Sequence, residues 1–298
     1  MSYIKAYEYQ SSVNPILEQI PILSKNYKKC NYGITTINLS QLYNVNFEAT
    51  SPNLLASFLK IENNKEFIFE NNDSFNASSH LFYVIEGEAK IIIDHLEEYN
   101  ISEGYIVVLP YFTKLVIINQ SNNDFSSYYI NDSPLLNYIG TIPNKKIFKT
   151  SIYSKDFIFD NLIKLSDPSN NRKGILLGNE DTELLGIKTI SHILWSLYNE
   201  VPPKTDQRPH KHNSVALDYC IYSPDETKVY TLIGEELDEN NNIINPKKIY
   251  WKTGSMFITP PGLWHSHHNE THNKNAYVLP IQDAGLLLYQ RILGIVLK

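Results

Sequence analysis

Five of the nine histidines in this 298-residue chain fall in two short stretches. His210 and His212 stand one residue apart in "PHKHNSVALD", and His265, His267 and His268 follow in "GLWHSHHN". Neutral imidazoles are common ligands of divalent metals. Residues i and i+2 of a strand project from one face, roughly 6.5–7 Å apart, so His210 and His212 can converge on one ion. Alone, the pair is a weak signal, because nine histidines produce an HxH by chance fairly often.

The residues that lead up to His265 strengthen the case for a shared metal site. The spacing is glycine, five residues, proline, one residue, glycine, two residues, histidine, three residues and asparagine, at Gly254, Pro260, Gly262, His265 and Asn269. Gly254 permits a tight turn into an apolar strand, and Pro260 and Gly262 end that strand with a bend. We therefore expect His265 to be directed into a barrel mouth beside the HxH strand. Three neutral nitrogens on one side of a metal leave its other positions open, as catalysis requires.

The rest of the chain is typical of an all-β protein, with 42% hydrophobic and 12% aromatic residues. Short runs rich in β-branched and aromatic residues, closed by Gly, Asn, Asp or Pro, predict strands from about 54 to 131 and from about 185 to 281. A short helix is expected around 11–20. Residues 134–180 break the strand pattern, and "KDFIFDNLIKLSDPSNNRKG" within them predicts a helix followed by a loop.

The two strand-rich halves resemble each other, which indicates an internal repeat. In both, a strand, a turn and a second strand precede a glycine, five residues and a proline, at Gly104 and Pro110 and again at Gly254 and Pro260. We interpret this as a duplicated β-barrel, with an N-terminal unit and helical lead-in at 1–150 and a metal-binding unit at 151–298. Two unrelated all-β segments are the alternative.

The histidine spacing resembles that of the cupin superfamily, whose fold is a jelly-roll (double-stranded β-helix) barrel; two such barrels make a bicupin. More narrowly, residues 191–283, with HxHxxxAL and WHxHxN, resemble gentisate 1,2-dioxygenase-like proteins. Ala216 stands where most cupins carry a glutamate ligand. The resemblance implies iron bound by three histidines without that glutamate. In this group the metal can lie in the N-terminal unit, so a site in the C-terminal unit is a departure.

The resemblance also implies that the N-terminal unit has lost its metal site. Counted from Gly87 and Pro110, the four ligand positions fall at Ser74, Asn76, His80 and Leu115. One imidazole among four positions does not hold a divalent ion well. We therefore expect His80 to be a hydrogen-bonded structural residue.

Other residues near the motifs are candidates for catalysis and substrate binding. Asp218 occupies a place where gentisate-type enzymes commonly have an arginine, and we expect it to orient an imidazole or to approach the metal. His267 is a candidate general acid or base, or a residue that hydrogen-bonds to a metal ligand and orients it. Arg208 is a candidate anion clamp in place of the missing arginine, and Trp264 and Tyr219 either line the pocket or fill the barrel.

The function that the resemblance implies is a mononuclear non-haem Fe(II) dioxygenase that cleaves a small chelating aromatic acid or diketone with O₂. A non-redox isomerase or lyase using Mn, Zn or Ni is an alternative, and so is a bicupin that binds a metal or small ligand without catalysis. Asp218 would repel a substrate carboxylate, which argues against gentisate itself.

Charge and composition argue against several other partners. The formal net charge is −6 without a Lys/Arg-dense face, so nucleic acid is not expected as a partner. Two cysteines and no signal-like or bilayer-spanning run predict a cytoplasmic chain that does not bind a membrane. The apolar run "LLLYQRILGIVLK" at 286–298 suggests packing across the barrels or against a second subunit, so a homodimer is expected.

Overall fold

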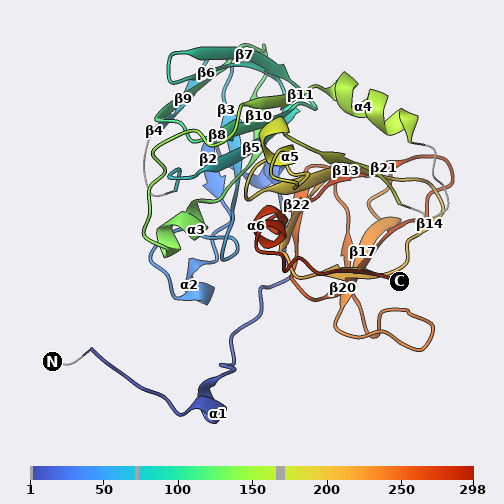
Figure 1. The fold of residues 1–298 in the computed structure, drawn as a ribbon. Coiled ribbons are helices and arrows are strands. Elements are labelled where there is room, and N and C mark those ends of the chain that lie inside the picture. Colours follow the sequence, from blue (N-terminus) through green and yellow to red (C-terminus); the bar gives the residue numbers. More distant parts are fainter. Residues whose placement is uncertain (1–2, 71–73, 166–171) are drawn as a thin grey trace.

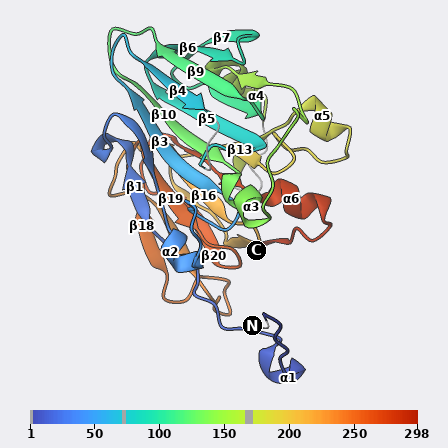
Figure 2. The same cartoon turned by 90° about the vertical axis from the view of Figure 1, so that its left-hand side faces the viewer.

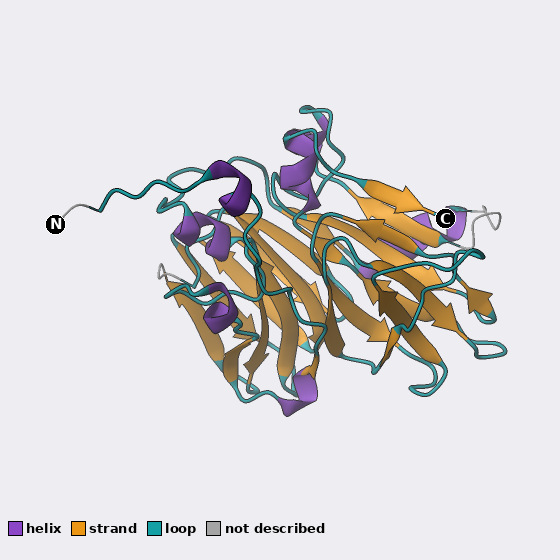
Figure 3. Ribbon diagram, turned by 90° about the horizontal axis from the view of Figure 1, so that it is seen from below, coloured by secondary structure: helices purple, strands orange, loops and turns teal. Residues whose placement is uncertain are grey.

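The computed structural model describes residues 3–70, 74–165 and 172–298. The chain folds into two antiparallel β-barrels that lie against each other, coloured blue to green and yellow to red in Figure 1. Seen from below, strands make up most of both barrels and the helices lie at their edges (Figure 3). The all-β prediction is therefore confirmed.

The N-terminal barrel pairs a six-stranded sheet, in the order β11-β8-β5-β10-β3-β2, with a four-stranded sheet, in the order β4-β9-β6-β7. The strands are β2 (Gly33–Thr36), β3 (Leu55–Ile61), β4 (Glu66–Glu70), β5 (Ser79–Glu86), β6 (Glu88–Ile93), β7 (Glu97–Ser102), β8 (Ile106–Pro110), β9 (Lys114–Asn119), β10 (Phe125–Asn131) and β11 (Ser151–Tyr153).

The C-terminal barrel pairs a seven-stranded sheet, β1-β19-β16-β21-β13-β12 with β22, and a six-stranded sheet, β18-β17-β20-β15-β23 with β14. The strands are β1 (Ser24–Asn26), β12 (Lys173–Leu177), β13 (Trp195–Val201), β14 (Thr205–Asp206), β15 (His210–His212), β16 (Ala216–Tyr222), β17 (Val229–Gly234), β18 (Lys247–Tyr250), β19 (Ser255–Thr259), β20 (Trp264–Asn269), β21 (Ala276–Leu279), β22 (Ile281–Gln282) and β23 (Ile295–Leu297).

The helices are short. They are α1 (Tyr9–Ser12), the 3₁₀ turn η1 (Tyr27–Lys29), α2 (Ser40–Tyr43), α3 (Ser133–Tyr138), α4 (Lys155–Lys164), α5 (Glu180–Glu183) and α6 (Ala284–Tyr289). The helix expected around 11–20 is only the single turn of α1, which lies away from the barrels in Figure 1. The helix expected from Lys155 is confirmed as α4, but much of the loop expected after it lies outside the described residues.

One expected strand begins later than the sequence suggested. The run from 185 becomes a strand only at Trp195, where β13 starts. Before it the chain bends, because the Ser191 hydroxyl accepts the amides of Ile193 (3.3 Å) and Leu194 (2.9 Å). This serine offers the backbone a local partner in place of a ladder.

The two barrels have the same strand register. In the first, Ser79 and His80 of β5 pair with Pro110 and Leu109 of β8. In the second, Ala216 pairs with Thr259, directly before Pro260. His80 is thus the counterpart of Ala216, and Leu115 of His265, as the spacing of glycine and proline predicts.

A buried asparagine closes the same turn in each barrel. Asn119 donates to the carbonyls of Ile61 (3.1 Å) and Asn123 (2.8 Å) and accepts the amide and hydroxyl of Ser121. Asn269 makes the same four bonds, to Val201 and Lys274 as acceptors and from Thr271 as donor. Such detail in both halves supports a duplicated unit.

The apolar core has three parts. One fills the N-terminal barrel, one lies inside the C-terminal barrel, and the largest lies where the two barrels meet. The barrels also exchange strands. β1 pairs with β19 of the C-terminal barrel (Figure 2), and β11 pairs with β8 of the N-terminal barrel. Two strands therefore cross the division expected at residue 150. Among the described residues, no helix is long and apolar enough to span a membrane.

Candidate metal centre

Three histidines meet at one end of the C-terminal barrel. His210 of β15 pairs directly with His265 of β20, and His212 lies one pleat further along β15. Each of the three offers a ring nitrogen, and these nitrogens all lie within 4.8 Å of one another. Gly262, with φ +80°, makes the bend before β20 and donates its amide to the His212 carbonyl at 2.7 Å. The two motifs are therefore parts of one site, as their spacing predicts.

Hydrogen bonds set the proton positions of two of these imidazoles. The His212 Nδ1 lies 2.9 Å from the Ser214 carbonyl, and the His265 Nδ1 lies 3.1 Å from the Leu263 carbonyl. Because a carbonyl only accepts, both Nδ1 atoms donate and both Nε2 atoms carry the lone pair. At His212 this lone pair accepts a long bond of 3.5 Å from the Gln282 amide nitrogen. These two rings are ready to bind a cation through Nε2.

His210 has a different partner. Its Nδ1 lies 3.1 Å from Nη1 of Arg172, whose Nη2 donates to the Arg208 carbonyl at 2.6 Å. A guanidinium has only donors, so Nδ1 of His210 accepts and the neutral ring carries its proton on Nε2. A metal can bind His210 only after Arg172 moves or this proton leaves.

Burial keeps the histidines of this site neutral. It lowers the pKa of His210 and His265 well below the usual value and lowers that of His212, and neighbouring imidazoles and Arg172 lower the pKa of His210 further. Burial also lowers the pKa of His267 to about 3. Neutral imidazoles are the form that binds metals.

The donor set fits a divalent transition metal. Bonds of about 2.1 Å place ligand nitrogens about 3–4 Å apart around one ion. Once His210 has been released from Arg172 or has lost its Nε2 proton, rings with nitrogens within 4.8 Å of one another need only a small inward rotation. Three imidazoles suit Fe, Zn, Cu or Ni better than the oxygen-preferring Mg or Ca. Within the described residues, no carboxylate belongs to this ligand group.

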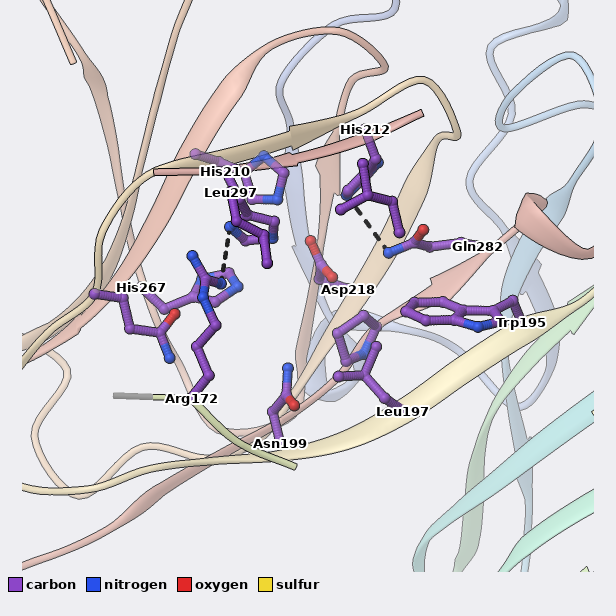
Figure 4. Close-up of a pocket in the computed structure, with 14 residues that line it drawn as sticks. Arg172, Trp195, Leu197, Asn199, His210, His212, Asp218, His267, Gln282 and Leu297 are labelled. Carbon is purple, nitrogen blue, oxygen red and sulfur yellow. Dashed lines mark hydrogen bonds between the residues drawn. The ribbon is translucent and has the colours of Figure 1, made fainter. Parts of the chain in front are cut away.

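The histidines face a cavity of about 170 Å³ (Figure 4). Its apolar lining comes from Trp195, Leu197, Pro280, Ile295 and Leu297, and its polar lining, besides the histidines, from Arg172, Asn199, Gln207, Asp218 and Gln282. A cavity that combines apolar walls with fixed polar groups is typical of a small-molecule site.

Asp218 and His267 both line this cavity, as expected. The Thr259 hydroxyl donates to Asp218 at 2.6 Å, and burial raises the pKa of Asp218 to about 7. His267 bonds through Nδ1 to the Thr231 hydroxyl at 2.9 Å. The rings of His212 and His265 are oriented by backbone carbonyls, whereas the hydrogen bond of Asp218 is made with Thr259.

The three residues suggested for substrate binding lie elsewhere. Tyr219 faces the other barrel, where its ring stacks on Tyr128 with centroids 5.0 Å apart. Trp264 lies on the outer face, with Nζ of Lys211 4.7 Å from its ring. Arg208 is exposed and its guanidinium donates to the Asn240 carbonyl at 3.4 Å. Because side chains alternate along a strand, Tyr219 and Trp264 point away from their neighbours Asp218 and His265.

His268, the next residue of β20 after His267, is also buried. It stacks on Tyr230 with ring centroids 4.9 Å apart, and its Nδ1 lies 2.8 Å from Asp206 and its Nε2 2.7 Å from the Ser266 hydroxyl. This resembles a hydrolytic triad in connectivity only. Ser266 is 1% exposed, so a substrate cannot reach the hydroxyl.

The N-terminal barrel has kept a structural histidine. His80 is fully buried, its Nδ1 lies 2.8 Å from the Tyr129 hydroxyl, and its ring packs on Phe112 at 4.3 Å. Burial lowers its pKa to about 3. The expectation that His80 is a hydrogen-bonded residue of the scaffold is confirmed.

Several cavity residues were not anticipated from the sequence. Arg172 comes from the connection before β12, Asn199 from β13, and Ile295 and Leu297 from β23. The sequence offered one hint that Arg172 belongs to the site, namely a positive charge within residues 134–180, where the strand pattern is interrupted. The apolar run that contains Leu297 suggested a packing surface but not which one.

The comparisons with known proteins agree with this architecture. No protein-family model and no curated protein sequence matches the chain. Solved structures match it over almost its whole length, and they show the fold of a bicupin.

Two kinds of enzyme are among the matching structures. A salicylate 1,2-dioxygenase from Pseudaminobacter salicylatoxidans has a TM-score of 0.75 at 11% identity and covers 98% of this chain and 93% of its own. The same kind of enzyme in its adducts with gentisate has a TM-score of 0.72 at 10% identity, covering 96% and 87%. An oxalate decarboxylase has a TM-score of 0.54 at 12% identity, covering 91% and 78%.

Proposed function

We propose that the chain is a mononuclear non-haem Fe(II) dioxygenase that cleaves a small chelating acid or diketone. The observation that carries this proposal is the group of three neutral imidazoles facing one cavity, with no carboxylate from the described part of the chain among the ligands. The fold shared with a salicylate 1,2-dioxygenase supports it. Mn, Zn and Ni are the alternative metals for the same nitrogen ligands.

Iron bound by the three histidines would supply the electron transfer and O₂ chemistry that side chains lack. Arg172 would bind the anionic end of the substrate, because its fork of donors fits a carboxylate and it lines the cavity. This role replaces the one suggested for Arg208. If Arg172 turned from His210 to the substrate, the Nδ1 of His210 would also become free to bind the metal.

Two residues of the cavity are suited to proton transfer. Asp218, with a pKa of about 7, holds or releases a proton near neutral pH. When protonated, its carboxyl group could donate a hydrogen bond to a substrate anion, which an ionised carboxylate would repel. His267 is neutral, and with Nδ1 bonded to Thr231, its Nε2 is the nitrogen left for a substrate group.

Oxygen uptake tests the proposal. Chain loaded anaerobically with Fe(II) should consume one O₂ per substrate cleaved when salicylate, gentisate and 1,3-diketones are screened in an oxygen electrode. His212→Ala should abolish the uptake. Turnover without O₂ would favour an isomerase or lyase, and tight binding without turnover would favour a ligand-binding bicupin; either would overturn the dioxygenase.

A further inference from the structure

One side of the metal cavity is built by the last strand of the chain. β23 pairs antiparallel with β15, and its register places Leu297 opposite His210 and Ile295 opposite His212. Directly paired residues of neighbouring strands project to the same face. Ile295 and Leu297 therefore point into the cavity, which both line, and Val296 points outward with Lys211. Figure 4 shows Leu297 beside His210.

Among the residues that the structure describes, β23 pairs along one edge only, with β15. Outside the ladder, Asn213 donates its amide to the Gly294 carbonyl (3.2 Å) and its side chain to the Ile292 carbonyl (2.8 Å), and accepts the Gly294 amide (2.8 Å). The Lys298 amide donates to the Pro209 carbonyl at 3.1 Å. All these contacts are made with residues 209–213, on or beside the strand that carries two of the metal ligands.

Little of the strand is buried. Ile295 is 45% exposed and Leu297 61% exposed, although both line the cavity. Segments with few buried apolar contacts open at a lower free-energy cost than the core. β23 therefore covers the cavity without belonging to the core of the barrel.

The N-terminal barrel lacks this strand within its described residues. After α3 the Thr141 amide donates to Leu136 and the Asn76 side chain donates to the Thr141 carbonyl. After α6 Ile292 is held in the same way, by Leu287 and Asn213. Of these two segments, only the one after α6 continues as a strand, β23, beside His210 and His212. The addition occurs in the barrel that has the three histidines.

We propose that Ile295 and Leu297 form a removable wall that determines which ligands enter and fit the metal cavity. Their side chains add to the apolar lining of Trp195 and Leu197, and Arg172 lies at the polar side. The site would thus select a carboxylate with one small apolar ring and exclude larger ring systems. Only the identity of the ligand rests on the proposed function.

Accessibility of the metal-free chain tests the wall independently of catalysis. Diethylpyrocarbonate modification of His212, followed by mass spectrometry, should be at least about tenfold faster in a chain ending at Leu293 or in Leu297→Ala. Val296→Ala is the matched control, because its side chain leaves the same strand on the outer face. Modification of His80 reports unfolding. Equal rates in Leu297→Ala, Val296→Ala and wild type, with His80 protected, would overturn the wall.

Ligand size tests selectivity. In the Zn(II)-loaded chain, Leu297→Ala should raise the affinity for 2-naphthoate relative to benzoate by about tenfold or more, measured by calorimetry. Val296→Ala should leave the ratio unchanged. Equal ratios in all three chains would overturn the selectivity. Loss of O₂ uptake in every chain with the ratio still shifted would count against the dioxygenase and leave the wall standing.

Discussion

Equivalent positions in the two barrels have opposite polarity. Around the metal cavity the C-terminal barrel carries Asp218, Thr231, Thr259, His265 and His267. The same register positions in the N-terminal barrel hold Phe82, Ile91, Leu109, Leu115 and Ile117. All five of these apolar side chains are buried in one core. The fold therefore permits either a packed interior or a polar cavity, and the inward residues decide which.

The two interiors are stabilised differently. In the N-terminal barrel, Phe69 contacts five aromatic rings with centroids 4.8–6.4 Å away. In the C-terminal barrel, the buried side chains of Thr231 and Asp218 are paired, through the bonds from Trp251 to Thr231 (2.8 Å) and from Thr259 to Asp218 (2.6 Å). An unpaired buried polar group costs about 1–3 kcal/mol. The apolar barrel supplies a scaffold on which the polar one can hold a site.

The largest expected effect comes from moving an N-terminal residue into the C-terminal barrel. His265→Leu installs the counterpart of Leu115 and removes one of three ligands, so the affinity for Zn(II) or Co(II) should fall at least about 1,000-fold, or about 4 kcal/mol. Metal titration followed by calorimetry measures the loss. His80→Leu is the control and should leave the affinity unchanged; a similar loss there would mean that the barrels share the metal.

A second expectation concerns what the barrels have in common. Asn119→Ala and Asn269→Ala each remove the same four bonds from a buried turn, so each should lower the free energy of unfolding by about 2–4 kcal/mol. Urea unfolding of the metal-free chain measures both. A cost confined to one barrel would show that the turns are not equivalent.

Arg172 distinguishes the barrels at their rims. Its counterpart in register is Tyr32, which is exposed and bonds to Asp124. Arg172→Met should weaken benzoate binding to the Zn(II)-loaded chain about 10–100-fold, because a charge-assisted fork to the carboxylate is lost. Arg208→Met is the matched control and should have little effect. A larger effect at Arg208 would restore the role first suggested for it.

The smallest effect is the pH dependence contributed by His80. Its pKa is about 3 in the folded chain against 6.5 ordinarily, so between these values the unfolded chain binds a proton that the folded chain does not. The free energy of unfolding therefore falls with falling pH, by about 1.4 kcal/mol per unit for this group below about pH 6. His80→Leu should remove that part of the slope in urea unfolding from pH 6 to pH 5. An unchanged slope would contradict the assignment.

The sequence alone predicts the fold and the ligands because both follow from local spacing. The HxH pair lies within one strand, the glycine–proline motif spans two consecutive strands and the turn between them, and the repeat aligns the barrels. Strand alternation would also have excluded Tyr219 and Trp264, which adjoin residues facing inward. Arg172 and Leu297 could not be found this way, because they reach the cavity from distant segments through tertiary packing.

The metal-to-chain ratio after anaerobic reconstitution with Fe(II) tests the asymmetry between the barrels most directly. Elemental analysis of the desalted chain should find about one ion per chain, and His212→Ala should lose it. Two ions per chain would show that the N-terminal barrel also binds metal. No ion in the wild-type chain would contradict the site at His210, His212 and His265.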